Sequence, residues 1–150
     1  MSISKLFSDL GAPLRNIVWS WGAVSEKNEI FLRVWQDQVR NIDGSSFVRL
    51  TDYAYFEGSN NLGFNERQRQ IEKLRKGCKG FIIFCVAQST VAARRRIQSY
   101  VKDRIFPTGE IIEIDGDVWV EFTLGVRVKD FLAASERTYT SPPTASAPQP

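Results

Sequence analysis

Histidine is missing from this sequence, and its absence excludes several classes of chemistry. Without an imidazole the chain cannot form a Ser-His-Asp or Cys-His nucleophilic centre or an HNH-type nuclease site. Nearly every arrangement of structural or catalytic zinc is excluded as well. Any reaction would have to use carboxylates, lysines, hydroxyls, thiols or magnesium.

Long apolar runs and glycine-rich loops are also lacking. No stretch after Met1 is long and apolar enough for a signal peptide or a membrane span, so we expect a cytoplasmic protein with no membrane partner. The segment GCKG is too short for a phosphate-binding loop, and it follows a predicted helix instead of opening one. We therefore expect no cofactor.

Cysteine occurs only at positions 78 and 85. Cys85 lies in the apolar run FIIFCV and Cys78 in a loop, which predicts two free thiols and no disulfide. Cys78 follows the end of a predicted helix, where the helix dipole disfavours a thiolate, although Lys76 and Lys79 favour one. These opposed effects argue against a redox or nucleophilic role for Cys78.

Positive charge is concentrated in one part of the chain. The net charge is +3, but residues 64–104 hold eleven lysines and arginines against three acids and so carry +8, which leaves −5 for the rest. Such segregation creates a directional field and suggests a polyanionic partner, here nucleic acid. The alternative is a pair of solvated helix faces. The candidate phosphate-binding residues are Arg67, Arg69, Lys73, Lys76, Lys79, Arg94, Arg95 and Arg96.

The composition indicates one globular domain followed by a tail. A chain of 150 residues with 43% hydrophobic and 25% charged residues can bury a core of its own. From Ser135 onward the chain is rich in Ser, Thr, Pro and Ala. We expect residues 1–134 to form the domain and residues 135–150 to form a disordered tail.

Apolar periodicity and capping residues predict three helices, at residues 2–10, 65–76 and 90–103. Strands are predicted at residues 47–50 and 81–87, together with two hairpins. This order favours an α+β fold, in which three helices pack on a curved, mostly antiparallel sheet or small barrel.

The second predicted hairpin joins residues 110–114 to residues 117–124. Asp115-Gly116 between them is the preferred central pair of a type I′ turn. The turn sets the pairing arithmetically: Ile114 with Asp117, Ile112 with Trp119, and Glu110 with Glu121.

The first predicted hairpin, residues 17–36, holds three of the four tryptophans. Residues 17–24 and 29–36 are rich in Val, Ile, Phe and Trp, and polar residues 25–28 form the turn. A turn with an even number of residues pairs Val24 with Glu29, which places Phe31, Arg33 and Trp35 opposite small residues on one face. A flat ring could stack on that face. Alternatively, a second layer of the protein covers it and Arg33 reaches a carboxylate.

This aromatic face and the aromatic loop that follows residue 50 suggest a base-binding site. Stacking on an aromatic ring is worth about 1–3 kcal/mol per base, and arginines supply phosphate contacts. An extruded base also needs polar groups that read its edge. The candidate base-binding residues are Phe31, Arg33, Trp35, Asp37, Tyr53, Tyr55, Phe56 and Asn60.

Glu110 and Glu121 raise a further hypothesis. Like charges opposite each other in a hairpin repel unless a cation or an arginine lies between them, and magnesium held by two carboxylates is a hydrolytic arrangement. No lysine follows at the spacing of the Asp…Glu-x-Lys nuclease core, and neutralisation by the arginines at 94–96 is the simpler explanation. We therefore assign no metal ligand and no catalytic residue.

Several runs of the sequence resemble a known family. WSWGAV, IFLRVWQDQ, a helix ending in LRKG before the strand FIIFCV, and GEIIEIDGDVWVEF resemble a family of small uncharacterised bacterial proteins linked to restriction and phage defence. This match extends to about Phe131. The basic helix ending in Lys-Gly before a buried strand is also similar to the PUA-like superfamily, which includes the EVE and SRA readers of modified bases. That resemblance implies an aromatic cage for a modified or extruded base, mapped onto Trp35, Phe31 and the loop of Tyr53 to Phe56.

The sequence therefore favours a non-catalytic nucleic-acid-binding domain that recognises a modified or flipped base in an aromatic pocket. The first alternative is a protein-interaction module, such as a phage or defence accessory protein, whose basic surface meets an acidic partner. The second alternative is a magnesium-dependent nuclease.

Overall fold

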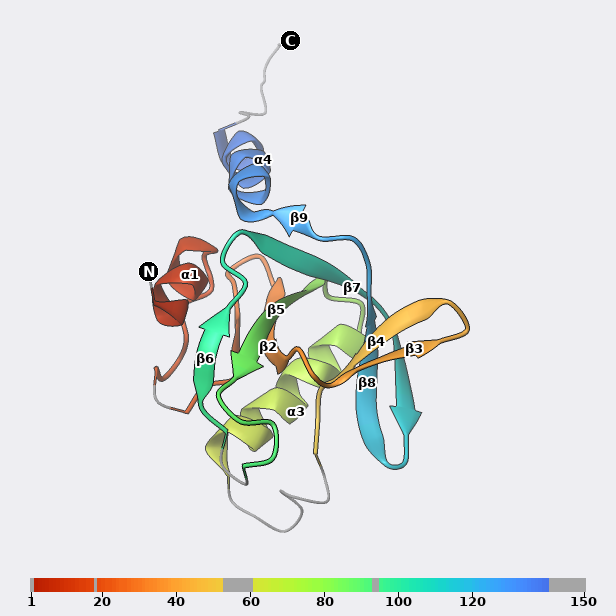
Figure 1. Ribbon diagram of the computed structural model, residues 1–150. Helices are drawn as coiled ribbons and strands as arrows, with labels where there is room; N and C mark the ends of the chain where they lie inside the picture. The colour runs from red at the N-terminus through yellow and green to blue at the C-terminus, as the bar shows by residue number, and fades with distance from the viewer. Residues whose placement is uncertain (1, 18, 53–60, 93–94, 141–150) are drawn as a thin grey trace.

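The computed structural model describes residues 2–17, 19–52, 61–92 and 95–140. These residues form an α+β fold with three helices and nine strands (Figure 1). The helices are α1 (Ile3–Asp9), α3 (Leu62–Arg75) and α4 (Val128–Thr140). The strands are β1 (Gly22–Val24), β2 (Ile30–Trp35), β3 (Val39–Ile42), β4 (Ser45–Arg49), β5 (Gly80–Ala87), β6 (Ile97–Tyr100), β7 (Arg104–Ile114), β8 (Asp117–Phe122) and β9 (Val126–Arg127).

The strands form one open sheet. Their order is β1-β2-β5-β7-β8-β4-β3, with β6 paired to β5 and β9 paired to β7. Only β2 and β5 run parallel among the described pairs. The predicted α+β class, with three helices and a mostly antiparallel sheet, is confirmed. The sheet is open and does not close into the barrel that was the other expectation.

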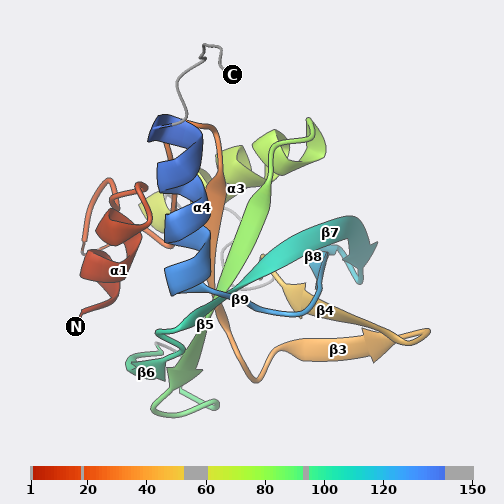
Figure 2. The same ribbon diagram turned by 90° about the horizontal axis from the view of Figure 1, so that it is seen from above.

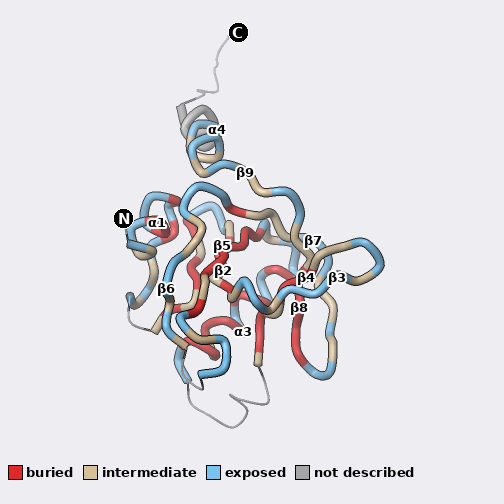
Figure 3. The backbone as a smooth tube through the Cα atoms, in the orientation of Figure 1, coloured by how far each residue is buried: buried red, intermediate tan, exposed pale blue. Residues whose placement is uncertain are grey.

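Helices cover both faces of the β2–β5 region of the sheet. One core cluster joins Ile71 and Leu74 of α3 to residues such as Leu32 and Ile82. The other cluster joins Leu6 and Phe7 of α1, with partly buried residues of α4, to the opposite face. Figure 2 shows α1 and α4 together on one side of β5, and Figure 3 shows buried residues along β2, β5 and α3. The β2–β5 region is therefore a central layer between helices.

Capping residues set the two ends of α3. The Asn61 side chain accepts a hydrogen bond from the Phe64 N–H at 2.9 Å, so the helix begins one turn earlier than the predicted start at Asn65. Gly77 has φ +99°, and the N–H of Cys78 donates to the Lys73 carbonyl at 3.1 Å. This arrangement is a Schellman motif, so Gly77 ends the helix as predicted.

The register of the first hairpin differs from the predicted one. Val24 pairs with Ile30, and not with Glu29, because the connection contains five residues, an odd number. Asn28 adopts φ +59° in this loop, and the Ser25 N–H donates to the Glu29 carbonyl at 2.8 Å. The first strand is also shorter than predicted, since β1 begins only at Gly22.

The second hairpin forms with the predicted turn. Ile114 pairs with Asp117 and Ile112 with Trp119, and both turn residues have positive φ, as a type I′ turn requires. The register shifts between Thr108 and Ile111, where β7 has a bulge. The predicted pairing of Glu110 with Glu121 is therefore wrong.

The helix predicted at residues 90–103 is also wrong. Residues 97–100 form β6, which pairs with the last residues of β5, for example Tyr100 with Cys85. β7 pairs with β5 only at Phe81 and Ile82, so the rest of that edge would lack hydrogen bonds without β6. The hydrogen bonds that β6 makes along this edge outweigh the tendency of these residues to form a helix, because a short isolated helix is only marginally stable.

Three other predicted elements are present. They are the helix at residues 2–10, which is α1, and the strands at 47–50 and 81–87, which are β4 and β5. At the other end of the chain, α4 continues past Ser135 to Thr140, and residues 141–150 of the predicted tail lie outside the described residues. None of the helices in the described part of the chain has the length and apolar character that a membrane span needs.

Candidate functional site

Phe31 lies inside the protein and is closed to a ligand. Its side chain is completely buried, its ring stacks on that of Phe81 at a centroid distance of 5.3 Å, and it meets the ring of Phe131 edge-on at 5.9 Å. Helices α1 and α4 supply the layer that covers this face. The prediction that Phe31 contacts a base is wrong, and the alternative of a covering second layer is correct for this residue.

Trp35, Asp37 and Arg95 lie together, as a shared site would require. However, Arg95 already interacts with both of the other side chains. The Arg95 guanidinium lies 5.5 Å from the centre of a Trp35 ring. It also donates to both oxygens of Asp37, at 2.6 and 2.9 Å, and to the Thr90 carbonyl at 2.8 Å. These hydrogen bonds lower the pKa of the Asp37 carboxyl. Arg95 thus occupies the place on Trp35 where a base was predicted to stack.

Five further predicted residues cannot be placed in this site. Tyr53, Tyr55, Phe56, Asn60 and Arg94 lie outside the described residues. A base-binding role for the first four residues and a phosphate-binding role for Arg94 stay predictions.

Arg67 was predicted to contact phosphate, but it is buried at 3% exposure. Its guanidinium donates to the carbonyls of Leu50 at 2.9 Å, Trp21 at 3.0 Å and Arg33 at 2.7 Å. Burial lowers the pKa of Arg67 to about 9. Arg67 therefore joins three backbone segments to α3, and its assignment to phosphate binding is wrong.

The position of Arg67 in the helix would have revealed its burial. Phe64, Arg67, Ile71 and Leu74 follow the i, i+3, i+7, i+10 pattern of one helix face, and all four are buried. Charge alone does not distinguish Arg67 from the exposed cations of the same helix, whereas this periodicity does.

Sequence reasoning also missed a buried polar cluster around Arg67. Glu66 and Gln70 are buried on α3, and the Ser20 hydroxyl donates to Glu66 at 3.4 Å. Burial raises the pKa of Glu66 and lowers that of the half-buried Arg33. Within the described residues, Glu66 Oε1, Gln70 Oε1 and Arg67 Nε have no hydrogen-bond partner. The cluster is closed to solvent, so we assign it a structural role.

The exposed face of α3 carries a row of cations. Arg69, Lys73 and Lys76 are all exposed, and none makes an ion pair within the part of the chain that the structure describes. We call these three residues the α3 cation row. Lys79 follows the helix and is exposed as well. By contrast, Arg75 on the same helix lies 3.7 Å from Glu72 and 3.6 Å from Glu113.

Some cations elsewhere on the surface are paired with acids. The pairs are Lys5 with Asp9 at 3.0 Å, Arg49 with Asp117 at 2.5 Å, Arg95 with Asp37 at 2.6 Å, and Arg127 with Asp130 at 3.1 Å. Arg96, another predicted phosphate contact, is exposed just before β6. It was predicted to lie on a helix, but that helix does not form. Other exposed cations, such as Arg104 and Lys129, also make no ion pair among the described residues. The α3 cation row differs from them because it places three such cations on one side of a single helix.

Glu110 and Glu121 are not paired in the register of the β7–β8 hairpin. The N–H of Glu110 donates to Glu121 Oε1 at 3.2 Å, which gives one carboxylate a backbone partner. No group of three or more Cys, Asp or Glu side chains that could hold a metal occurs among the described residues.

Both cysteines are free, as predicted. Cys78 is half-buried, and burial raises the pKa of the Cys85 thiol to about 11.

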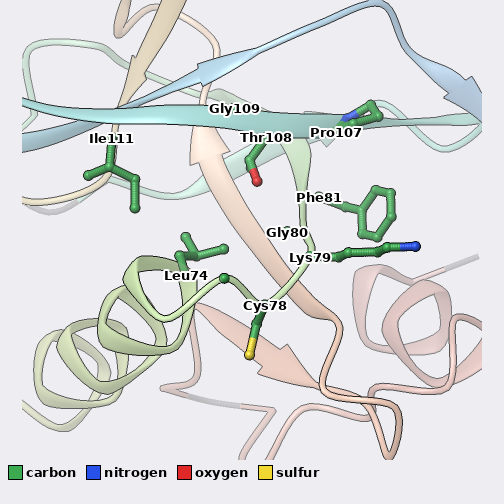
Figure 4. Close-up of a pocket in the computed structure, with 10 residues that line it drawn as sticks. Leu74, Cys78, Lys79, Gly80, Phe81, Pro107, Thr108, Gly109 and Ile111 are labelled. Atoms are coloured by element: carbon green, nitrogen blue, oxygen red, sulfur yellow. The ribbon is translucent and has the colours of Figure 1, made fainter.

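A hollow of about 460 Å³ lies at the C-terminal end of α3. Its lining includes Leu74 and Cys78 from the end of the helix and Thr108 and Ile111 from β7. Figure 4 shows Leu74, Thr108 and Ile111 pointing toward one space, while Lys79 points away from it. The hollow lies between the end of α3 and β7, and the sequence did not predict it.

Comparisons with models of protein families, with curated proteins and with solved structures found no match to this chain.

Proposed function

We propose that this chain is a non-catalytic nucleic-acid-binding domain that holds the sugar–phosphate backbone along the exposed face of α3. The observation that carries the proposal is the α3 cation row, which places three exposed cations on one side of a helix without an ion pair among the described residues. Cations that are already paired with acids gain little from a phosphate, whereas unpaired cations release counterions from the nucleic acid when they bind.

The spacing of the row supports a contact with several phosphates. Arg69 and Lys76 are seven residues apart, which is about 10 Å along a helix that rises about 1.5 Å per residue. One strand of a duplex advances about 3.4 Å per nucleotide, so the row spans about three nucleotides. A lysine or an arginine can donate to any phosphate oxygen, and such contacts position a strand without reading its sequence.

The proposal does not use the aromatic face of β2. Phe31 is buried and Arg95 covers Trp35, so stacking on these two rings has no support. The proposed binding therefore relies on charge and not on stacking.

The test is the salt dependence of binding to a labelled duplex and a labelled single strand, measured by fluorescence anisotropy. If three phosphate contacts form, duplex affinity should fall about 40-fold between about 50 and about 200 mM salt. Arg69→Glu combined with Lys73→Glu should weaken binding to every sequence and should lower the salt slope by about two.

The matched control changes the net charge by the same amount elsewhere. Arg104 and Lys129 are exposed on β7 and α4, so Arg104→Glu combined with Lys129→Glu should leave the salt slope unchanged. If neither nucleic acid binds at the lower salt concentration, the proposal fails, and an acidic protein becomes the better partner for the α3 cation row.

A further inference from the structure

Trp19 is the one tryptophan whose ring has no aromatic or cationic partner among the described residues. The other three rings each lie beneath an arginine: Trp21 beneath Arg67 at 5.7 Å, Trp35 beneath Arg95 at 5.5 Å, and Trp119 beneath Arg40 at 4.8 Å. Trp19 is half-buried, and it belongs to neither of the two core clusters. Its ring therefore keeps part of its surface available to a ligand.

A compact turn holds the backbone of Trp19 in place. The Trp19 N–H donates to Asn16 Oδ1 at 3.3 Å, and the Ser20 N–H donates to the Asn16 carbonyl at 2.9 Å. The Asn16 N–H donates in turn to the Ser20 hydroxyl at 3.0 Å. A side chain on a backbone that is already ordered loses less conformational freedom when a ligand binds. Trp19 is thus suited to act as a fixed stacking surface.

This turn packs against α3 on the side that carries the α3 cation row. The Ser20 hydroxyl donates to Glu66 at 3.4 Å, and the Trp19 carbonyl oxygen lies 2.6 Å from the place that a Cβ atom on Gly63 would take. Arg69, the first residue of the row, follows Glu66 by three residues and so projects from the same side of the helix. The segment that holds Trp19 therefore runs along the edge of α3 beside the row.

Arg15 adds a further cation next to this edge. Burial raises the pKa of Glu66, and the hydrogen bond from Ser20 and the charges of Arg69 and Arg15 oppose that rise. Both arginines therefore lie near Glu66, although they belong to different segments of the chain. Arg15 is exposed and makes no ion pair within the described part of the chain. Positive charge thus continues from the row onto the segment that holds Trp19.

We propose that Trp19 stacks on one unpaired base of a single-stranded nucleic acid whose phosphates lie along the α3 cation row. This inference rests on the proposed function and adds one stacking contact to it, at a ring outside the aromatic face of β2. Bases in a duplex are already stacked and paired, so they reach the ring only after extrusion, which costs free energy. Every base has a π-face, so this contact should favour unpaired strands without selecting a sequence.

The test compares a labelled single strand with a strand of the same length that has the sugar–phosphate backbone but no bases. One base on Trp19 should make the normal strand bind about tenfold more tightly than the abasic strand. Trp19→Ala should reduce this ratio to about one and leave the abasic affinity unchanged, whereas Trp19→Phe keeps a ring and should retain part of the ratio. Trp35→Ala is the matched control, because Arg95 covers that ring, and it should leave the ratio unchanged.

A second readout follows the wild-type side chain directly. Protein labelled with fluorotryptophan gives one ¹⁹F NMR signal for each of its four tryptophans, and Trp19→Phe identifies the signal of Trp19. That signal should shift on addition of the normal strand and not of the abasic strand. If Trp19→Ala fails to fold by circular dichroism, these spectra decide.

The outcomes separate the two proposals. Equal affinity of the wild-type protein for both strands, or a Trp19 signal that does not respond to bases, would overturn the inference and leave the nucleic-acid-binding function standing. Loss of binding to both strands would overturn the proposed function too. An unchanged ratio in folded Trp19→Ala would show that a base stacks elsewhere on the protein and would refute the assignment to Trp19.

Discussion

Two ionisable side chains of α3 are buried, although most ionisable side chains remain in water. Arg67 and Glu66 are buried beside each other on α3, where loss of hydration opposes their charges. The three backbone carbonyls around Arg67 offset that loss, because each accepts a hydrogen bond from the cation. Glu66 has less support, since one of its oxygens has no partner in the described structure.

Glu66 should make the stability of the protein depend on pH. Because its pKa is raised in the folded protein, the folded state holds the proton more tightly than the unfolded chain, and stability should fall as pH rises through the folded pKa. Glu66→Gln keeps the acceptor for Ser20 and removes the charge, so it should raise the free energy of unfolding at pH 7 by about 1 kcal/mol. Urea unfolding at several pH values measures this difference, which should shrink as the pH is lowered.

Glu72→Gln is the control for this experiment. Glu72 is exposed on the same helix, so its substitution should change stability by less than about 0.5 kcal/mol at any pH. If Glu66→Gln destabilises the protein at pH 7, the ionised carboxylate contributes favourable interactions that outweigh its burial.

At the scale of elements, local signals determined helix ends and tight turns. Gly77 ends α3 and Asp115-Gly116 forms the β7–β8 turn as predicted, because positive φ values restrict the choice of residue strongly. The five-residue loop before β2 and the strand β6 were not predictable in this way. The first depends on how Ser25 and Glu29 pair, and the second on an open edge of β5 that only the assembled sheet creates.

The candidate site shows the same division. Arg69, Lys73 and Lys76 were predicted to contact phosphate, and all three are exposed on α3, as such a contact requires. The burial of Phe31 depends on α1 and α4, which are distant in sequence, so no local pattern revealed it. The hollow lies beside a bulge in β7, which forms only in the folded sheet.

The prediction at the element scale concerns the end of α3. Gly77→Ala places a Cβ on a residue with φ +99° and should lower the free energy of unfolding by about 1–2 kcal/mol. Lys76→Ala is the matched control, because Lys76 has φ −84° and an ordinary residue fits there. Urea unfolding measures both variants. Equal stability of the two would mean that the Schellman motif is not needed to end the helix.

The whole molecule is stabilised from both faces of one sheet. Cluster residues on the α3 side and on the α1–α4 side meet through alternate residues of β2 and β5. Leu32 faces one layer and Phe31 the other. The helix nearest the C-terminus is therefore part of the fold, since Phe131 of α4 contacts the rings of Phe31 and Phe81 at 5.9 and 5.1 Å.

The prediction at this scale is that Phe131→Ala lowers the free energy of unfolding by about 2–3 kcal/mol through loss of these ring contacts. Lys129→Ala, on an exposed position of the same helix, should have little effect. Thermal unfolding measures both variants, and nucleic-acid binding should persist in each at a temperature where it is folded. A neutral Phe131→Ala would show that α4 does not contribute to the second core cluster.

The position of β3 at the end of the strand order bears on self-association of the protein at high concentration. One edge of β3 pairs with β4, and its other edge has no neighbouring strand in the described sheet. Such an edge can recruit a strand from another molecule and begin self-association. Arg40, held 4.8 Å from the centre of a Trp119 ring, keeps a cation on this strand. Two copies that meet edge to edge would bring like charges together, so Arg40 should favour a dispersed, monomeric protein.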